Sequence, residues 1–239
     1  MFDIREDHIQ PGTLLKDAQA LHTGSKGAVF DLDGLLIDSE PHWWWAQAIT
    51  LEEAGAMVTE SRMIETTDPG LEAAFILWRE WLPEAPLEKK AIGDRLQELM
   101  GERIAKEGKA KLGVHHTIEI CRKAGCRLAV TSSSGTLFIR IALRRLGVLE
   151  YFHVLVSSQE MQQGKPHPAV YMAVAKRLGL LPGECLAFED SIHGLQSAKS
   201  AGMRCVAVPE GMGASGAGSG IANIVLPSLD SFTLHMLTA

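Results

Sequence analysis

Two aspartates, Asp31 and Asp33, directly follow the apolar run Ala28–Phe30 and are separated by one leucine. Residues i and i+2 of a strand point the same way, so both carboxylates can reach one small volume at the strand's end. Two ionised carboxylates about 4 Å apart repel by roughly 4 kcal/mol at an effective dielectric constant near 20. A bound hard cation with oxygen ligands would relieve this repulsion. The pair therefore indicates a metal-assisted site with one nucleophilic carboxylate and one that carries a proton.

Chemically useful side chains also follow three later apolar runs. They are Thr131 and Ser132, then Lys165 a short segment beyond the run 154–157, then Glu189 and Asp190. In an open parallel sheet, ligands bind beyond the carboxyl ends of the strands. Each group alone has an ordinary explanation as a helix cap or a surface side chain. Their joint order along the chain favours one shared site.

The carboxylates of this set supply what phosphoryl transfer requires. We expect Asp31 to attack phosphorus and form an aspartyl phosphate. We expect Asp33 to protonate the leaving group and then to activate water. Mg²⁺ held by Asp31, the Asp33 carbonyl and Asp190, with Glu189 as a further candidate ligand, would bridge the nucleophile and the phosphate.

The remaining groups of the set are suited to binding phosphate. The Thr131 hydroxyl and the Ser132 amide can hold phosphate oxygens where a helix begins. The Lys165 ammonium can bind the same oxygens and also contact Asp31. Local positive charge of this kind is needed, because the chain carries a net charge of -6 and its substrate would be anionic.

Strand-like and helical patterns alternate through most of the chain. The expected strands are Ala28–Phe30, Arg127–Thr131, Val154–Ser157, Cys185–Phe188, Cys205–Val208 and Ile224–Leu226, and helical patterns lie near 115–124, 135–146, 167–178 and 191–201. Such alternation predicts an α/β fold, a Rossmann-like parallel sheet with helices on both faces.

Residues 42–112 have a different pattern of apolar residues, because they lack strand-like runs and show helical periodicity. They predict a small α-helical cap domain inserted after the first strand. We therefore expect an N-terminal extension at 1–24, a catalytic core at 25–38 and 113–239, and the cap at 39–112. The glycine-, alanine- and serine-rich segment 212–220 is expected to be a surface loop.

Composition excludes several classes of function. The 239 residues include 29 acidic and 23 basic side chains with no long basic run, which disfavours nucleic-acid binding. No apolar stretch is long enough to cross a membrane. The four cysteines show no zinc-type spacing, so we expect them to be reduced core residues of a cytoplasmic protein. The expected partner is a small phosphorylated substrate, and the expected state is a monomer or weak dimer.

Four segments together resemble the motifs of the haloacid dehalogenase superfamily. They are Phe30–Pro41, Val130–Ser133, Gly164–Pro168 and Phe188–Gly194. The helical insert is similar to the cap of the subfamily that contains β-phosphoglucomutase and many sugar phosphatases. The run from Gly34 to Pro41 is similar to 2-deoxyglucose-6-phosphate and hexitol-phosphate phosphatases. The resemblance implies a Rossmann-like core, Mg²⁺ dependence and the residue roles given above.

Within that superfamily, Asp33 and Asp190 argue against dehalogenation, since the dehalogenases lack the second aspartate and the metal. Mutases of the family carry a histidine where this chain has Trp43. They also carry a basic residue in a cap loop, and the corresponding stretch 66–70 of this chain has none. We therefore expect a phosphatase acting on a sugar or polyol phosphate. A sugar phosphomutase is the alternative, followed by a catalytically silent phosphometabolite-binding protein. Glu40, His42 and Trp43 are candidate substrate contacts.

Overall fold

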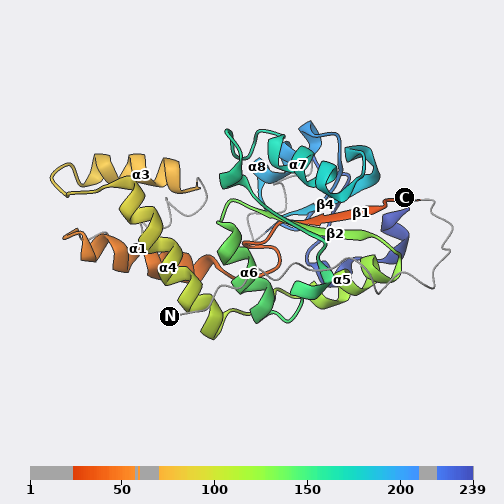
Figure 1. Ribbon diagram of the computed structural model, residues 1–239, viewed down its shortest axis with the longest axis horizontal. Helices are drawn as coiled ribbons and strands as arrows, with labels where there is room; N and C mark the ends of the chain where they lie inside the picture. The colour runs from red at the N-terminus through yellow and green to blue at the C-terminus, as the bar shows by residue number, and fades with distance from the viewer. Residues whose placement is uncertain (1–23, 57–58, 60–69, 210–219, 239) are drawn as a thin grey trace.

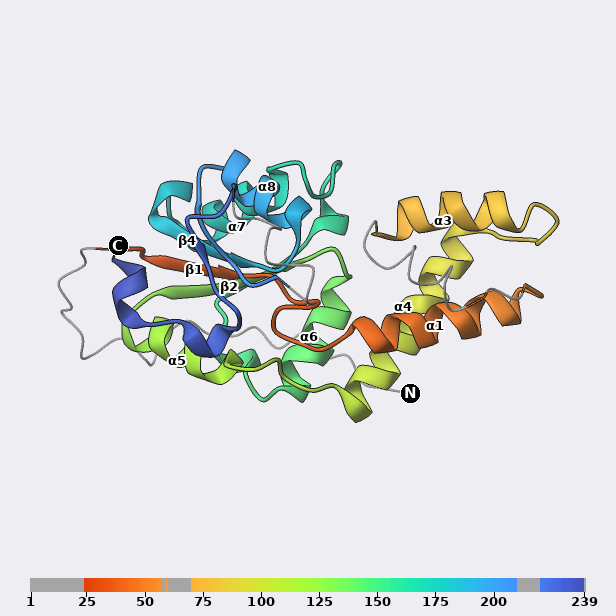
Figure 2. The same cartoon turned by 180° about the vertical axis from the view of Figure 1, so that it is seen from behind.

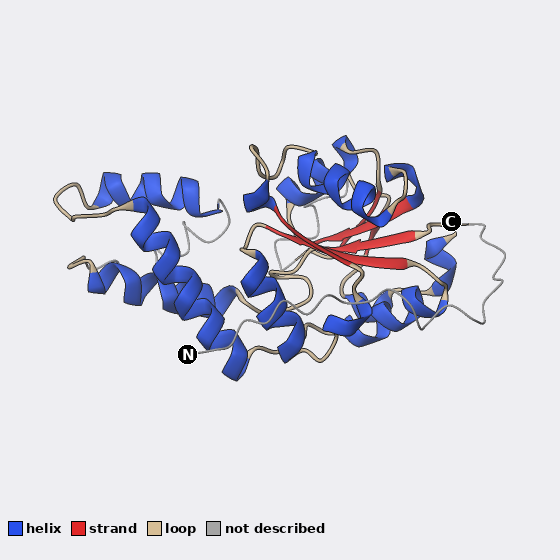
Figure 3. Cartoon of the chain, in the orientation of Figure 1, coloured by secondary structure: helices blue, strands red, loops and turns tan. Residues whose placement is uncertain are grey.

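The computed structural model describes residues 24–56, 59, 70–209 and 220–238. Within these residues six parallel strands form one sheet in the order β3-β2-β1-β4-β5-β6. The strands are β1 (Gly27–Phe30), β2 (Arg127–Ser132), β3 (Val154–Ser157), β4 (Cys185–Glu189), β5 (Arg204–Ala207) and β6 (Ile224–Val225). Each predicted strand is present within about one residue of its expected ends, and the predicted α/β fold is confirmed (Figure 3).

Helices cover both faces of the sheet (Figure 1). They are α5 (Val114–Lys123), α6 (Thr136–Arg145), α7 (Ala169–Leu178) and α8 (Ile192–Ser200). α7 and α8 pack on one face, and α5, α6 and the C-terminal residues lie on the other (Figure 2). Strand side chains alternate between these faces, so Phe30 and Phe188 stack in one layer while Val29 and Ala187 lie in the opposite one.

The described part of residues 40–107 contains α1 (Glu40–Glu53), α3 (Gly70–Trp81) and α4 (Lys89–Glu107) and no strand, as the periodicity predicts. These helices lie to one side of the sheet (Figure 1). α1 begins where the sequence places Pro41 in the first helical turn, a position that suits proline. Their buried apolar residues belong to one cluster that also includes residues of α6, and α4 packs on both α1 and α6.

Two connections join these helices to the sheet, and they are hydrogen-bonded to each other. The amide of Asp38 donates to the carbonyl of Lys109 (3.0 Å), and the amide of Lys111 donates to the carbonyl of Leu36 (3.1 Å). The first connection starts from a tight turn at Gly34, whose φ of 77° favours glycine. The insert is therefore attached to the sheet at one place, where its two connections run side by side next to Asp33. The division into core and cap domains remains a prediction.

Some predictions concern residues outside the described ones. These are the extension at 1–23, most of the glycine-rich segment and the stretch 66–69. The four cysteines are buried and unpaired, as expected. No helix among the described residues is long and apolar enough to span a membrane.

Candidate active site

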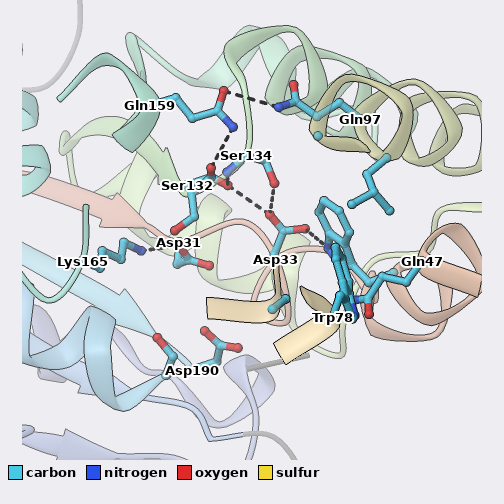
Figure 4. A pocket seen from close by; sticks show the side chains of 16 residues that line it. Asp31, Asp33, Gln47, Trp78, Gln97, Ser132, Ser134, Gln159, Lys165 and Asp190 are labelled. Carbon is cyan, nitrogen blue, oxygen red and sulfur yellow. Dashed lines mark hydrogen bonds and ion pairs between the residues drawn. The ribbon is translucent and has the colours of Figure 1, made fainter. Parts of the chain in front are cut away.

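The carboxyl ends of β1, β2 and β4 bring the predicted residues together around one cavity of about 250 Å³ (Figure 4). Asp31 follows β1 directly, and its amide donates to the carbonyl of Phe188 in the neighbouring strand (3.0 Å). The cavity wall includes Asp31, Asp33, Ser132, Ser133, Lys165 and Asp190. Residues up to 159 positions apart therefore meet because parallel strands end at one edge of the sheet.

Lys165 connects two carboxylates at the bottom of this cavity. Its ammonium donates to Asp31 Oδ1 and to Glu189 Oε1, each at 2.5 Å, and its side chain is only 7% exposed. Glu189 is fully buried and also accepts a hydrogen bond from the Tyr171 hydroxyl. The expected contact between Lys165 and Asp31 is present, whereas sequence reasoning missed Tyr171.

Three carboxylates, Asp31, Glu189 and Asp190, offer oxygen atoms that all lie within 4.8 Å of one another. Burial raises the pKa of Asp31 to about 8, although the adjacent Lys165 ammonium opposes the shift. Burial and the charges of Asp31 and Glu189 also raise the pKa of Asp190 well above its usual value. The ammonium can balance only one of three negative charges, so the ionised cluster would hold a divalent cation well.

The charge of Lys165 is stable in this setting. Burial alone would lower the pKa of its ammonium, but the charges of Asp31 and Glu189 outweigh burial and hold that pKa above its usual value. The lysine therefore stays a cation, whereas burial favours the protonated forms of Asp31 and Asp190.

Asp33 stands apart from this cluster and receives hydrogen bonds from three side chains (Figure 4). Its Oδ2 accepts from the hydroxyls of Ser132 (3.0 Å) and Ser134 (2.9 Å). Its Oδ1 accepts from Trp43 Nε1 (3.2 Å). Trp43 belongs to α1, so a side chain of the helical insert fixes the orientation of this carboxylate. The two aspartates thus have separate surroundings, as two different roles would require.

Thr131 is one of the predicted phosphate contacts. Its side chain is fully buried, its hydroxyl has no hydrogen-bond partner, and it does not line the cavity. The strand continues to Ser132, one residue further than expected, and neighbouring strand residues face opposite sides. The Ser132 hydroxyl points into the site, where it contacts Asp33, and the phosphate contact expected of Thr131 stays a prediction.

The candidate substrate contacts are only partly supported. Trp43 lines the cavity, and so does Gln47 one turn later on the same face of α1. Glu40 and His42 are absent from the cavity wall. Glu40 is the first residue of α1, at the connection, and His42 is about 100° around the helix from Trp43.

Other parts of the wall come from residues that the sequence did not single out as binding groups. They are Ala74 and Trp78 of α3, Gly93, Leu96 and Gln97 of α4, and Gln159 and Ser191 of the sheet's loops. Gln97 donates to Gln159 (3.5 Å), which donates to the Ser133 carbonyl (3.2 Å), so α4 contacts the core across the cavity (Figure 4). Trp78 is 1% exposed and also packs in the hydrophobic core.

Comparisons with known proteins agree with this geometry. The family model described as haloacid dehalogenase-like hydrolase matches residues 28–208. The phosphorylated carbohydrates phosphatase of Thermotoga maritima is 32% identical over 182 residues, which cover 74% of this chain and 82% of that protein. Hexitol phosphatase B of Escherichia coli is 28% identical over 207 residues, 86% of this chain and 93% of its own.

Solved structures show the same likeness. The crystal structure of CbbY from Rhodobacter sphaeroides in complex with phosphate superposes with a TM-score of 0.75 at 26% identity. The match covers 87% of this chain and 96% of that one.

Proposed function

The chain belongs to the haloacid dehalogenase-like hydrolase family, and we propose that it is a phosphatase that hydrolyses a small sugar or polyol phosphate through an aspartyl-phosphate intermediate. The observation that carries this proposal is the pairing of Asp31 with Lys165 at 2.5 Å, beside a separately held Asp33, at one cavity. An anionic nucleophile next to a fixed cation is what attack on a phosphate ester requires.

In the first step an Asp31 carboxylate oxygen attacks phosphorus. An O–P bond forms to Asp31, the ester P–O bond breaks, and Asp33 gives its proton to the departing alkoxide. In the second step Asp33 takes a proton from water, the water oxygen attacks phosphorus, and the bond to Asp31 breaks. Inorganic phosphate leaves, and both carboxylates return to their starting states.

The surrounding groups hold the phosphoryl oxygens. Lys165 provides a buried cation, and the Ser132 hydroxyl lies within reach of the same volume because it already contacts Asp33. Asp31 and Asp190, with Glu189 beside them, fit a Mg²⁺ ion because they cluster hard oxygen donors that carry excess negative charge. Bound there, Mg²⁺ would neutralise charge that accumulates on the phosphoryl group.

The wall opposite these carboxylates favours a sugar or polyol leaving group. It presents the indole rings of Trp43 and Trp78 and the amides of Gln47, Gln97 and Gln159. Aromatic surfaces pack against the C–H faces of sugars, and amides both donate to and accept from hydroxyls. The names of the hexitol and carbohydrate phosphatases among the relatives point to the same substrate class.

A panel of hexitol, hexose and short-chain polyol phosphates, assayed for released inorganic phosphate, tests the proposal. We expect Mg²⁺-dependent release that EDTA abolishes, and loss of release in Asp31→Asn and Asp33→Asn. Asp230→Asn, at an exposed position, is the matched control and should behave as the wild type. Isomerised sugar phosphate without phosphate release would indicate a mutase, and binding without turnover would indicate a silent binding protein; either result contradicts the proposal.

A further inference from the structure

Tyr171 is a fully buried tyrosine that the proposed chemistry does not use. It lies on α7, whose other buried residues are Val170, Val174, Ala175 and Leu178. A phenylalanine would satisfy such packing without bringing a polar atom into the core. The hydroxyl therefore calls for a partner, and that partner is the carboxylate of Glu189.

Tyr171 and Lys165 donate to the same oxygen, Oε1 of Glu189. The Lys165 ammonium also lies 5.4 Å from the centre of the Tyr171 ring, within the range of a cation–π contact. The phenol thus touches both ends of the Glu189–Lys165 ion pair. From there the ammonium reaches Asp31 at 2.5 Å, so a short chain of contacts runs from Tyr171 to the proposed nucleophile.

The other side of Glu189 is also restrained. Its Oε2 accepts from the Ser191 hydroxyl at 3.3 Å, and its carboxylate fills the space where a Cβ on Gly194 would stand. The carboxylate therefore has little room to translate, but rotation about its last torsion would move Oε1 away from Lys165. The Tyr171 hydroxyl opposes that rotation by donating to Oε1.

We propose that Tyr171 is a positioning residue that fixes the Glu189 carboxylate so that the Lys165 ammonium stays directed at Asp31. Lysine is a compact cation on a flexible four-carbon stem, so its placement depends on acceptors that are themselves held. The expected effect on kcat rests on the proposed function. The expected position of the Lys165 ammonium does not depend on turnover.

Tyr171→Phe tests the inference because it deletes the hydroxyl and keeps the ring. The chain's other tyrosine, Tyr151, is exposed on the far side of the sheet from α7, and Tyr151→Phe is the matched control. With the Mg²⁺-loaded protein we expect Tyr171→Phe to lower kcat about 10- to 100-fold, the usual effect of losing a residue that orients a charged group. KM should stay within about threefold, since the cavity wall is intact.

Crystal structures of the two variants supply the second readout. In Tyr171→Phe the Lys165 ammonium should leave hydrogen-bonding distance of Asp31, and in Tyr151→Phe it should remain there. A retained Lys165–Asp31 contact, or an unchanged kcat, overturns the inference even if the variant is less stable. Should the phenylalanine variant not fold, Tyr171→Met, which also lacks a hydroxyl, is measured in the same way.

The two proposals fail in different ways. If the wild-type protein releases no phosphate from any ester, the proposed function is wrong, and the positioning inference is decided by the position of Lys165 in the crystals. If the wild type is active and Lys165 does not move in Tyr171→Phe, the positioning inference alone is wrong.

Discussion

Replacing Asp31 by asparagine should abolish phosphate release and yet make the metal-free protein more stable in mildly alkaline solution. The Asp31 side chain is 8% exposed, and burial raises the pKa of its carboxyl from 3.8 to about 8. Ionising this group in the fold is therefore costly compared with ionising it in the unfolded chain. Asparagine has the same shape as the protonated acid and avoids that cost.

The magnitude follows from linkage between protonation and folding. A carboxyl whose pKa is raised by folding contributes its stability in full below its unfolded pKa, and this contribution is lost as the pH rises toward the folded pKa. Each pH unit between 3.8 and about 8 costs about 1.4 kcal/mol. From about pH 5.5 to about pH 8.5 the wild type should lose roughly 3 kcal/mol that Asp31→Asn keeps.

Urea unfolding in EDTA at these two pH values measures the difference. Excess Mg²⁺ should reduce the wild-type loss, because a cation bound at the carboxylates favours their ionised form, and it should affect Asp31→Asn much less. Asp230→Asn, at an exposed aspartate, should follow the wild type. The reasoning is refuted if the wild type and Asp31→Asn lose stability in parallel between the two pH values.

Three further outcomes are expected. Ser132→Ala should lower kcat about 10-fold in the phosphate-release assay, because its hydroxyl contacts Asp33. Thr131→Val should leave turnover unchanged and shift the urea-derived stability by no more than about 1 kcal/mol, because the Thr131 hydroxyl is buried without a partner; a large loss of turnover would restore the sequence-based role of Thr131. Gly194→Ala should destabilise the protein by at least about 2 kcal/mol in urea and weaken Mg²⁺-dependent activity, because its Cβ would lie 2.0 Å from the Glu189 carboxyl carbon; wild-type stability would contradict this geometry.

Much of the core of the site could be predicted because the ends of parallel strands can be recognised from a few neighbouring residues in the sequence. An apolar, β-branched run followed by polar residues marks a strand end, and all such ends lie at one edge of the sheet. Asp31, Asp33, Lys165 and Asp190 are each found at this edge for that reason. Lys165 lies in the segment between β3 and α7 and contacts Asp31 at this edge.

The end of β2 shows how much depends on a single residue in a sequence-based prediction. Side chains alternate along a strand, so the position of its last residue decides which of two neighbours faces the ligand. β2 extends to Ser132, one residue beyond the end expected from the sequence, and Ser132 rather than Thr131 lines the cavity. The pattern of apolar residues does not fix a strand end to a single residue, so it cannot decide between two neighbouring hydroxyls.

Residues missed by sequence reasoning lie on helices or depend on contacts between distant segments. Tyr171 is one of several apolar residues on α7, and nothing in its neighbourhood in the sequence indicates a carboxylate partner 18 positions away. Gln97 and Gln159 are ordinary surface residues until the fold places α4 beside the loop after β3. A helix can turn any of several faces to a cavity, and tertiary packing decides which one.

The catalytic groups lie at strand ends, whereas much of the remaining cavity wall lies on helices. This difference suggests why the chemistry and the choice of substrate can change separately. Asp31 and Glu189 stand at the ends of β1 and β4, whose register places them side by side, and Lys165 contacts both. Trp78 and Gln97 belong to α3 and α4, which join the sheet through a single paired crossing near Asp38 and Lys109. A substitution on these helices can reshape the wall without disturbing the strand ends. Its effect should therefore fall on KM and on the preferred leaving group, while the phosphoryl step keeps its dependence on Asp31.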